Sequence, residues 1–393
     1  MINSKPYRSL YTYAWDILDI GVKNFVEEVL AMGITDVTLA TSYHAGKFIR
    51  PHAKNPPRVI FPEDGVVYFN PNKDRYSDIQ PQAHSDEAIR KILPELLADA
   101  RLRIHGWTVL LHNSRIGAAY PKYTVKNAFG DPYVYSLCPM QDAVFDYAVA
   151  LCRDLSEQYA LRSLVLETPG WLPFEHGYHH EFAQVAPSAE INQLLGLCFC
   201  DACTRAAKAQ DIKIDTLQTQ VQEHISAFLS APGSLGADFD WSNKNMSAFI
   251  ELRQARVTHL VSAIKNILPS STELAVIPTV QRPTKACWTE GSELGALAQV
   301  ADYLEIPFYE PSAQRVLEDA EECLKHIPAK KISAILRPGL PDLNQGAELA
   351  TAMQGLANLG ITEFAFYNYG LLPQSGLDKL AATLLVTTPQ AKE

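Results

Sequence analysis

The chain has 393 residues, of which 47% are hydrophobic and 20% charged, the balance of a folded globular protein rather than a disordered one. With 34 Lys and Arg against 44 Asp and Glu, its net charge is −10 and no basic cluster is present. We therefore expect neither nucleic acid nor a membrane as a partner. Seven scattered cysteines and a start without the apolar core of a signal peptide predict a cytoplasmic protein in a reducing compartment.

Short apolar runs alternate with amphipathic helical patterns along the chain. The first run leads into a helix whose Phe25, Val26 and Val29 fall on one face, and Gly33 is placed to end that helix. In chain order we expect strands at 11–16, 34–40, 107–111, 161–166, 274–277, 303–307, 332–336 and 364–367. We expect the main helices at 22–32, 85–103, 141–159, 246–268, 294–300, 313–326, 347–359 and 377–385.

Eight strands, each followed by helical sequence, predict an α/β fold of the (β/α)8 TIM-barrel type. The alternative is an open doubly wound sheet, which usually carries a glycine-rich phosphate loop after its first strand, and residues 17–22 form no such loop. Residues 171–245 are too many for one strand-to-helix connection. We therefore predict a single barrel domain over 1–393, with an insertion after the fourth strand at 171–245 that lies over the barrel mouth.

Polar and aromatic residues gather where the expected strands end, which is where such barrels carry their chemistry. Aromatic platforms combined with amide, imidazole and guanidinium donors suit a ring that bears many hydroxyl groups. Arg282 and Asp342 stand at these ends as well. The residues that we expect to bind a substrate are Trp15, Asp16, Tyr43, His44, His112, Asn113, Arg115, Trp171, Gln281, Tyr309, Arg337, Tyr367, Asn368 and Tyr369.

Glu167 is the most informative single residue of this set. It follows the apolar residues 164–166, so its carboxyl group should be partly desolvated, which raises its pKa and suits it to donate a proton near neutral pH. The alternative is a structural glutamate that orients Arg337 or His112.

Cleavage of a glycosidic bond needs a second carboxylate, about 5–5.5 Å away for retention or about 6.5–9.5 Å for inversion of configuration. Glu305 is a candidate because burial within an apolar run is costly for a carboxylate without a partner or a function. Glu310, just past the sixth strand, is another, and Asp16 is a third. Glu305 could instead be paired inside the barrel, and Glu310 could begin a helix.

Three cysteines in six residues, Cys198, Cys200 and Cys203, have a spacing that allows them to share one tetrahedral Zn²⁺, with Cys138 as the fourth ligand. Such a closed site would be structural and would pin the insertion to the barrel. The alternative is that all seven cysteines are reduced and metal-free. We expect no organic cofactor. His176, Tyr178, His179 and His180 form a second group, which favours a surface loop or a substrate contact over a metal site.

The middle of the chain resembles that of family-42 β-galactosidases and related glycosyl-hydrolase-like barrels. The resemblance rests on Cys138 before Pro139, on the strand that ends in Glu167, and on the Cys198–Cys203 segment. The resemblance implies that Cys138, Cys198, Cys200 and Cys203 are zinc ligands and that Glu167 is the general acid/base. Leu166 stands where clan-A hydrolases have an asparagine. That clan carries its nucleophile at the end of strand seven, where this chain has Arg337, so the nucleophile is not carried over.

The sequence thus predicts a glycoside hydrolase that acts on a small glycoside or oligosaccharide. Arg115 and Arg337 favour an acidic sugar, since guanidinium groups bind carboxylates through two parallel hydrogen bonds. One alternative is a sugar isomerase, epimerase or lyase on the same barrel, with His112 or Tyr367 as base. Another is a carbohydrate-binding barrel without catalysis. The expected partner is a small carbohydrate. The sequence leaves open whether the chain forms a homo-oligomer.

Overall fold

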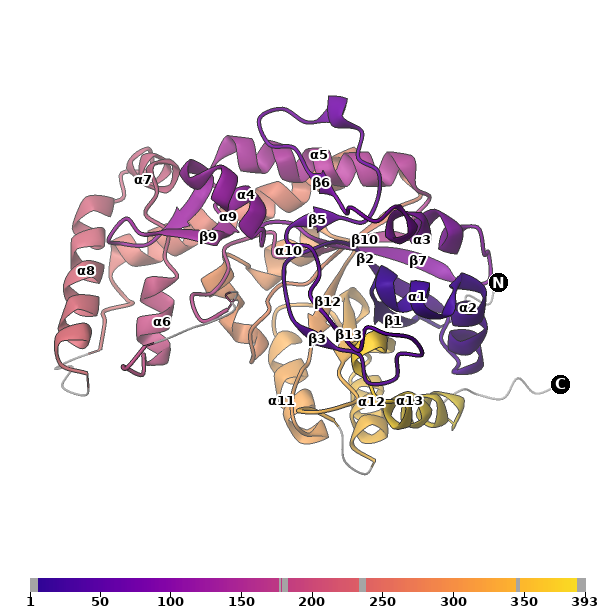
Figure 1. Cartoon of the computed structure of the whole chain (residues 1–393). Coiled ribbons are helices and arrows are strands. Elements are labelled where there is room, and N and C mark those ends of the chain that lie inside the picture. Colours follow the sequence, from indigo (N-terminus) through magenta and orange to yellow (C-terminus); the bar gives the residue numbers. More distant parts are fainter. Residues whose placement is uncertain (1–5, 177, 179–182, 233–237, 344–346, 387–393) are drawn as a thin grey trace.

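Eight parallel strands close into a barrel in the computed structural model, which describes residues 6–176, 178, 183–232, 238–343 and 347–386 (Figure 1). The barrel is closed because β1 pairs in parallel with both β2 and β14. The strands, in barrel order, are β1 (Arg8–Thr12), β2 (Asp36–Tyr43), β7 (Arg103–Val109), β10 (Ser163–Glu167), β11 (Glu273–Val276), β12 (Tyr303–Pro307), β13 (Ile332–Leu336) and β14 (Glu363–Phe366). The predicted (β/α)8 fold is confirmed.

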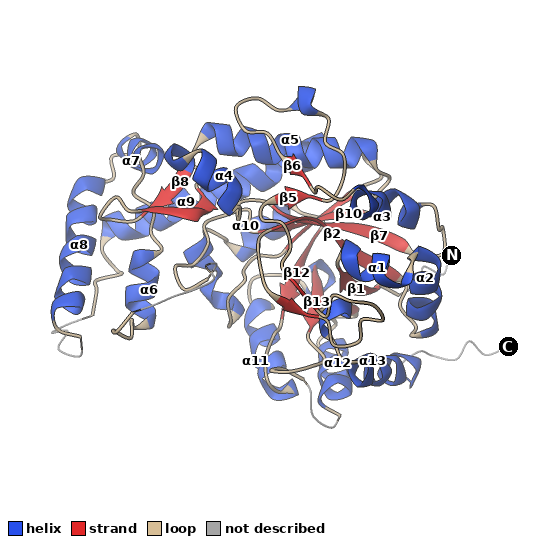
Figure 2. Ribbon diagram, in the orientation of Figure 1, coloured by secondary structure: helices blue, strands red, loops and turns tan. Residues whose placement is uncertain are grey.

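A helix follows each barrel strand, and Figure 2 shows these helices around the strands. None of the helices described is both long enough and apolar enough to cross a bilayer. The eight helices are α2 (Val22–Ala31), α3 (Glu87–Leu97), α5 (Asp142–Gln158), α9 (Lys244–Ile267), α10 (Leu294–Val300), α11 (Ala313–Cys323), α12 (Glu348–Asn358) and α13 (Gln374–Val386). The short elements of the first loops are β3 (Phe48–Ile49), β4 (Val59–Ile60), β5 (Val66–Val67), β6 (Gln82–Ala83) and α4 (Ser114–Ala119).

The amino ends of the strands carry a polar network inside the barrel. His105 Nε2 lies 2.9 Å from Asp36 Oδ1, and His105 Nδ1 lies 2.7 Å from Ser163 Oγ, all three side chains being buried. Hydrogen bonding makes the burial of these polar groups tolerable. β7 begins at Arg103 and not at residue 107 as expected. The first residues of this strand are polar, so a search for apolar runs does not find them.

The first strand lies earlier in the chain than the expected range 11–16. β1 ends at Thr12, and residues 14–20 form a short helix, α1 (Ala14–Ile20), which begins after the extended residue Tyr13 and has Asp16 in its first turn. A carboxylate is favourable there because of the helix dipole. Trp15 and Asp16 therefore belong to a helix and not to the end of a strand.

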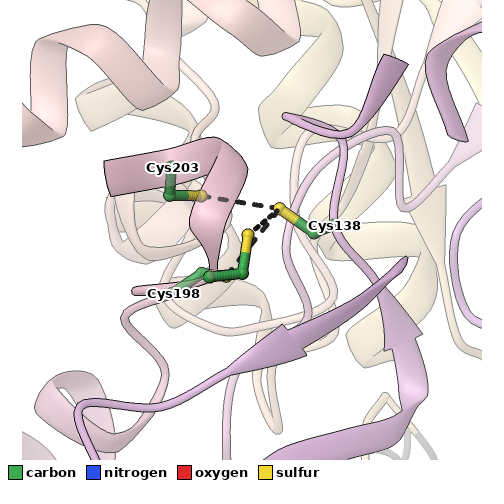
Figure 3. A group of neighbouring side chains, drawn as sticks. Cys138, Cys198 and Cys203 are labelled. Carbon is green, nitrogen blue, oxygen red and sulfur yellow. Dashed lines mark hydrogen bonds between the residues drawn. The ribbon is translucent and has the colours of Figure 1, made fainter. Parts of the chain in front are cut away.

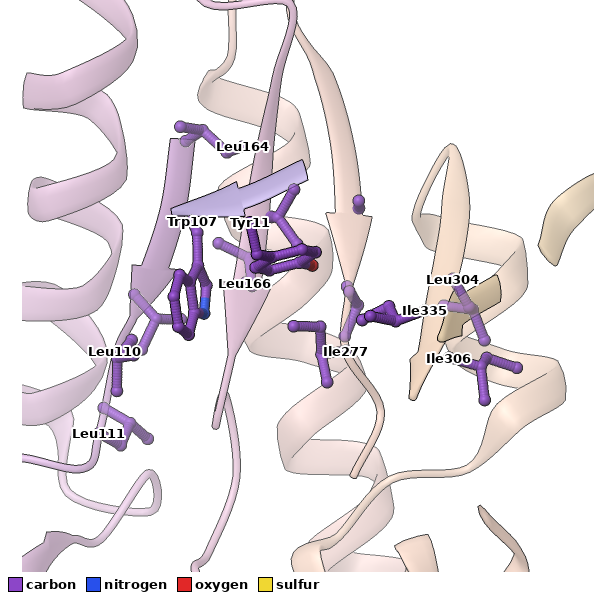
Figure 4. Close-up of a cluster of buried hydrophobic side chains, with 14 of the residues drawn as sticks. Tyr11, Trp107, Leu110, Leu111, Leu164, Leu166, Ile277, Leu304, Ile306 and Ile335 are labelled. Carbon is purple, nitrogen blue, oxygen red and sulfur yellow. The ribbon is translucent and has the colours of Figure 1, made fainter. Parts of the chain in front are cut away.

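Aromatic and aliphatic side chains fill the barrel above the polar network. Figure 4 shows part of this core, with Tyr11 and Trp107 close together, and their ring centroids are 5.1 Å apart in an edge-to-face arrangement. Both side chains are almost fully buried. They form the floor on which the site described below is built.

The insertion packs against a hairpin that follows β7. The hairpin consists of β8 (Thr124–Lys126) and β9 (Pro132–Leu137), and the described part of the insertion contains α6 (Ala189–Leu195), α7 (Asp201–Lys208) and α8 (Ile214–Ser230). Figure 1 shows these helices and β9 to one side of the barrel. The two parts are joined by hydrogen bonds such as that from Phe199 N to Lys126 O at 2.7 Å.

Candidate active site

A cavity of about 280 Å³ opens at the carboxyl ends of the barrel strands. Every one of the eight strands, or the loop that follows it, contributes to the wall, as in other barrels of this type. The lining residues are Tyr11, Tyr43, His44, Trp107, Glu167, His176, Ile277, Thr279, Val280, Gln281, Arg282, Pro307, Tyr309, Ile335, Arg337 and Tyr367.

Seven of the residues that we expect to be catalytic or to bind a substrate meet in this cavity. Arg282, which stands at the same strand end as Gln281, joins them. Glu167 is the one carboxylate among the described lining residues. The seven are Tyr43, His44, Glu167, Gln281, Tyr309, Arg337 and Tyr367.

Glu167 is the last residue of β10 and is partly buried. Its Oε2 accepts a hydrogen bond from Trp107 Nε1. Burial raises the pKa of Glu167 to about 7, although the hydrogen bond from Trp107 acts in the opposite direction. At neutral pH this carboxyl group is therefore protonated in a large fraction of molecules, as a proton donor requires.

Two guanidinium groups line the cavity at the β11 and β13 ends, and both pair with Asp342. Arg282 Nη1 lies 2.9 Å from Asp342 Oδ1, while Arg337 Nε and Nη2 donate to Asp342 Oδ2. The Arg337 guanidinium also lies 4.6 Å from the ring centroid of Tyr309. Because Asp342 is buried, its carboxylate fixes the orientation of both cations.

Tyrosine hydroxyls form a short chain at the cavity wall. The hydroxyl group of Tyr13 lies 3.1 Å from that of Tyr43 and 3.1 Å from that of Tyr367. Burial is the largest cause that raises the pKa of all three phenols, so they stay protonated and act as hydrogen-bond donors or acceptors, not as anions.

Glu305 does not reach the cavity. It occupies the middle of β12, and its carboxylate accepts hydrogen bonds from Tyr7 Oη at 2.6 Å and Tyr11 Oη at 2.8 Å. Since alternate residues of a strand face the same side, Glu305 lies one layer below Pro307, which does line the cavity. Its position is the one given by the alternative interpretation, a carboxylate paired inside the barrel.

Glu310 also stays outside the cavity. Its carboxylate is buried against Arg315, with Oε2 2.7 Å from Arg315 Nε. This ion pair lies at the start of α11. Neither of the two carboxylates that we expected opposite Glu167 is therefore among the lining residues.

Trp15 and Asp16 do not line the cavity either, because both belong to α1. Asp16 is buried, its Oδ1 accepts a hydrogen bond from Arg50 Nε at 3.0 Å, and burial raises its pKa to about 7. Trp15 stacks on Tyr13, with ring centroids 4.4 Å apart.

The three residues expected after β7 form a layer behind the wall. The His112 ring stacks on His44 with centroids 3.9 Å apart. Asn113 Oδ1 accepts a hydrogen bond from Ile116 N at 2.9 Å and so begins α4. Arg115 Nε donates to Asp64 O at 2.8 Å. These contacts support the loop that carries His44.

The remaining three expected residues do not line the cavity and pack within the fold. Trp171 is fully buried beneath Arg253. Asn368 Oδ1 accepts a hydrogen bond from Gly370 N at 3.0 Å and begins a short 3-10 turn, and Tyr369 is buried against Phe25.

Two aromatic lining residues, Tyr11 and Trp107, were not expected in the site, and a third, His176, belongs to the group for which we expect a surface loop or a substrate contact. Tyr11 and Trp107 lie inside their strands, and their position could have been found only with the correct strand bounds. His176 comes from the start of the insertion, and burial lowers its pKa, so it is neutral at pH 7. His179 and His180, grouped with it in the sequence, lie outside the described residues.

Glu290 is a further buried carboxyl group that the strand-end pattern did not indicate. It ends the 3-10 helix Thr284–Glu290, and its Oε1 accepts hydrogen bonds from Thr279 Oγ1 and Val280 N. Burial raises the pKa of Glu290 to about 8, and nearby Glu167 also raises it. Because Thr279 and Val280 line the cavity, Glu290 holds part of its wall in place.

Four buried cysteines, Cys138, Cys198, Cys200 and Cys203, lie together where β9 ends and α7 begins (Figure 3). Cys138 Sγ lies 3.5 Å from Cys203 Sγ, 3.6 Å from Cys200 Sγ and 3.7 Å from Cys198 Sγ. Four sulfur atoms around one Zn²⁺ at about 2.3 Å are about 3.8 Å apart, whereas a disulfide is about 2.05 Å long. The cluster therefore fits one tetrahedral metal ion and no disulfide.

The fold is similar to those of solved glycoside hydrolases. The glycoside hydrolase domain of PgaB (BpsB) from Bordetella bronchiseptica matches with a TM-score of 0.54 and 14% identity, over 96% of this chain and 99% of that one. The catalytic domain of β-amylase from Paenibacillus polymyxa matches with a TM-score of 0.60 and 11% identity, over 99% and 100%. The β-galactosidase from the psychrophilic Marinomonas ef1 matches with a TM-score of 0.57 and 9% identity, over 96% of this chain and 59% of that one.

A scan against protein-family models and a search of the curated proteins both give no match. At identities of 9 to 14%, the similarity to the solved structures shows the barrel fold. The resemblance to family 42 in particular stays a hypothesis.

Proposed function

We propose that this protein is a glycoside hydrolase in which Glu167 protonates the leaving oxygen. The observation that carries the proposal is a partly buried carboxyl group, with a pKa raised to about 7, in an aromatic-walled cavity at the carboxyl ends of the barrel strands. The similarity of the fold to glycoside hydrolases supports it. The cavity can enclose a sugar-sized ring, with Trp107 and Tyr367 as apolar faces.

An acidic sugar is the substrate that the charges favour. Arg282 and Arg337 line the cavity, and both pair with the single carboxylate of Asp342 behind it. This cluster of two cations and one anion has one positive charge in excess, and a substrate carboxylate would balance it through a charge-assisted hydrogen bond.

Hydrolysis also requires a group that takes a proton from the attacking water. His176 is our candidate, because its imidazole lines the cavity and is neutral at pH 7. In this scheme water adds to the anomeric carbon and gives its proton to His176, while the glycosidic bond breaks and the leaving oxygen takes the proton of Glu167.

Elimination is the second candidate, because the lining combines one carboxyl group with two guanidinium groups. A lyase removes the proton next to the carboxylate of a uronic acid, the adjacent C–O bond breaks, a C=C bond forms, and the leaving oxygen takes a proton. Arg337 would stabilise the charge that develops on the substrate carboxylate, His176 would be the base, and Glu167 would protonate the leaving oxygen.

Product analysis with a panel of oligosaccharides and aryl glycosides, uronides included, in H₂¹⁸O tests the proposal. Hydrolysis places one ¹⁸O in the released sugar, whereas elimination gives an unsaturated product that absorbs in the ultraviolet and carries no label. Binding of a sugar without either product at any pH would favour the carbohydrate-binding barrel and contradict both enzymes.

The pH dependence of kcat/KM is expected to report the acid. Since the active form has Glu167 protonated, kcat/KM should fall as the pH rises through about 7, by about tenfold per unit above it. The acid limb should lie below the usual histidine range, because burial lowers the pKa of His176. Initial rates from about pH 5 to pH 9 check this. A basic limb that is unchanged in Glu167→Gln would assign it to another group.

Arg337→Ala is expected to discriminate between acidic and neutral substrates. A lost charge-assisted hydrogen bond should lower kcat/KM on a uronide by about 10–100-fold. The matching neutral glycoside should change by less than about threefold. Arg337→Lys, which keeps the charge, is the matched control and should recover part of the loss. Equal losses on both substrates would mean that Arg337 serves the fold and not the recognition of a carboxylate.

We further propose that the four-cysteine cluster holds a structural zinc ion that pins the insertion to the barrel. The cluster is closed by four protein ligands, so the metal would supply stability and no open coordination position. The cytoplasmic location stays a prediction. The seven free cysteines agree with a reducing compartment.

A further inference from the structure

Arg253 is a buried cation that lacks an acidic partner. It lies on α9 with 1% of its surface exposed, and Nη2 donates to Thr289 O at 2.7 Å. Its Nε and Nη1 have no hydrogen-bond partner. In the part of the chain that the structure describes, no ion pair joins it to a carboxylate, whereas Arg256, one turn further, pairs with Asp142. A buried charge without a counter-charge is strongly unfavourable.

The four-cysteine cluster lies beside the part of α9 that carries Arg253. Phe199, between Cys198 and Cys200, stacks on Phe249 with ring centroids 5.6 Å apart, and Arg256 Nε donates to the O atom of Pro139, the residue after Cys138, at 2.8 Å. Burial lowers the pKa of Arg253, and Cys203, Cys198 and Cys138 act in the opposite direction, as thiolates would. The helices that carry them, α7 and α9, pack against each other. Four thiolates around one divalent ion leave about two negative charges uncompensated.

We propose that Arg253 is the buried counter-charge of a mononuclear tetrathiolate metal centre formed by Cys138, Cys198, Cys200 and Cys203. The inference extends the proposed metal site to its surroundings. The guanidinium carries one of the two compensating charges, and the metal centre makes the burial of the guanidinium tolerable. Each needs the other.

Arg253 also connects the metal centre to the loop that follows the candidate acid. Its guanidinium lies 4.5 Å from the ring centroid of Trp171, which comes shortly after Glu167 in the chain. Trp171 N in turn donates to Glu290 O at 3.1 Å. Arg253 is thus a positioning residue, through which the metal holds the β10 loop against the barrel.

The test measures how tightly the full-length protein holds Zn²⁺ and Co²⁺ in competition with the chelator 4-(2-pyridylazo)resorcinol. Arg253→Met and Arg253→Gln should weaken metal binding by about 10–100-fold, as expected for a lost neighbour of a metal ligand set. Arg253→Lys should lie closer to the wild type because it keeps the charge. Lys208→Met is the matched control: it also removes a cation next to the cluster, from α7, but Lys208 is exposed and pairs with Asp215.

Thermal unfolding with and without metal is a second measurement, in which Arg253→Met should shift the unfolding midpoint in opposite directions. In the metal-loaded protein, Arg253→Met should lower the unfolding midpoint. In the stripped protein it should raise the midpoint, because it removes an uncompensated buried charge. If Arg253→Met does not fold, the affinities of the Lys and Gln variants decide, and equal affinities for these two would overturn the proposal.

The two possible failures are distinguishable. A wild-type protein that binds neither Zn²⁺ nor Co²⁺ would contradict the metal site itself, and with it the role of Arg253. Unchanged metal affinity in both Arg253→Met and Arg253→Gln would leave the metal site standing and overturn the counter-charge proposal.

Discussion

Glu167→Gln is expected to lower kcat/KM by about 10²–10⁴-fold, the cost of losing a general acid. Glutamine keeps the size and the acceptor oxygen for Trp107 Nε1 but has no acidic proton. Glu310→Gln is the matched control, because Glu310 is bound to Arg315 outside the cavity, and it should change kcat/KM by less than about threefold.

The loss in Glu167→Gln should depend on the leaving group. An aryl glycoside whose phenol leaves readily as an anion needs little protonation, so its rate should fall least, whereas an alkyl glycoside should show the full loss. Rates across a series of leaving groups measure this. A uniform loss would indicate that Glu167 positions the sugar and does not protonate it, and wild-type rates throughout would remove it from the mechanism.

Removal of the four-cysteine site is the second prediction with a large effect. Cys138→Ser should abolish stoichiometric zinc binding and lower the free energy of unfolding by at least about 4 kcal/mol, since it breaks a buried four-ligand site that joins the insertion to the barrel. Metal analysis and denaturant unfolding measure the two effects.

Cys152→Ala is the control for that prediction. Cys152 is equally buried, but it lies in α5 outside the cluster, so its removal should cost about 1 kcal/mol and leave the zinc content unchanged. Protein purified without chelator that contains less than about 0.2 equivalents of zinc would contradict the metal site, because a closed four-sulfur site holds its ion tightly.

The barrel was predictable because its strands are buried on both faces. Strands such as β12 and β13 consist largely of apolar residues, and the expected bounds 303–307 and 332–336 agree with the structure. β1 and β7 were misplaced because their first residues, such as Ser9 and His105, are polar and satisfied only by partners on other strands. Such pairing depends on the closed barrel, so the sequence of a single segment does not predict it.

The candidate site was predictable where a residue ends a strand. Glu167 fits that pattern, whereas Glu305 stands in the middle of β12 and points one layer deeper, a difference that the strand bounds alone could have revealed. His176 reaches the cavity from the insertion, and Glu290 supports the cavity wall from a 3-10 helix. Their contribution depends on how long connections fold back, which local patterns do not determine.

A crystal structure of Glu167→Gln with an uncleaved oligosaccharide tests the central claim most directly. We predict that the side-chain amide at position 167 lies within about 2.6–3.2 Å of the glycosidic oxygen, the reach of direct proton transfer. A sugar chain that crosses the cavity with that oxygen beyond the reach of residue 167, or that binds outside the cavity, would contradict the account.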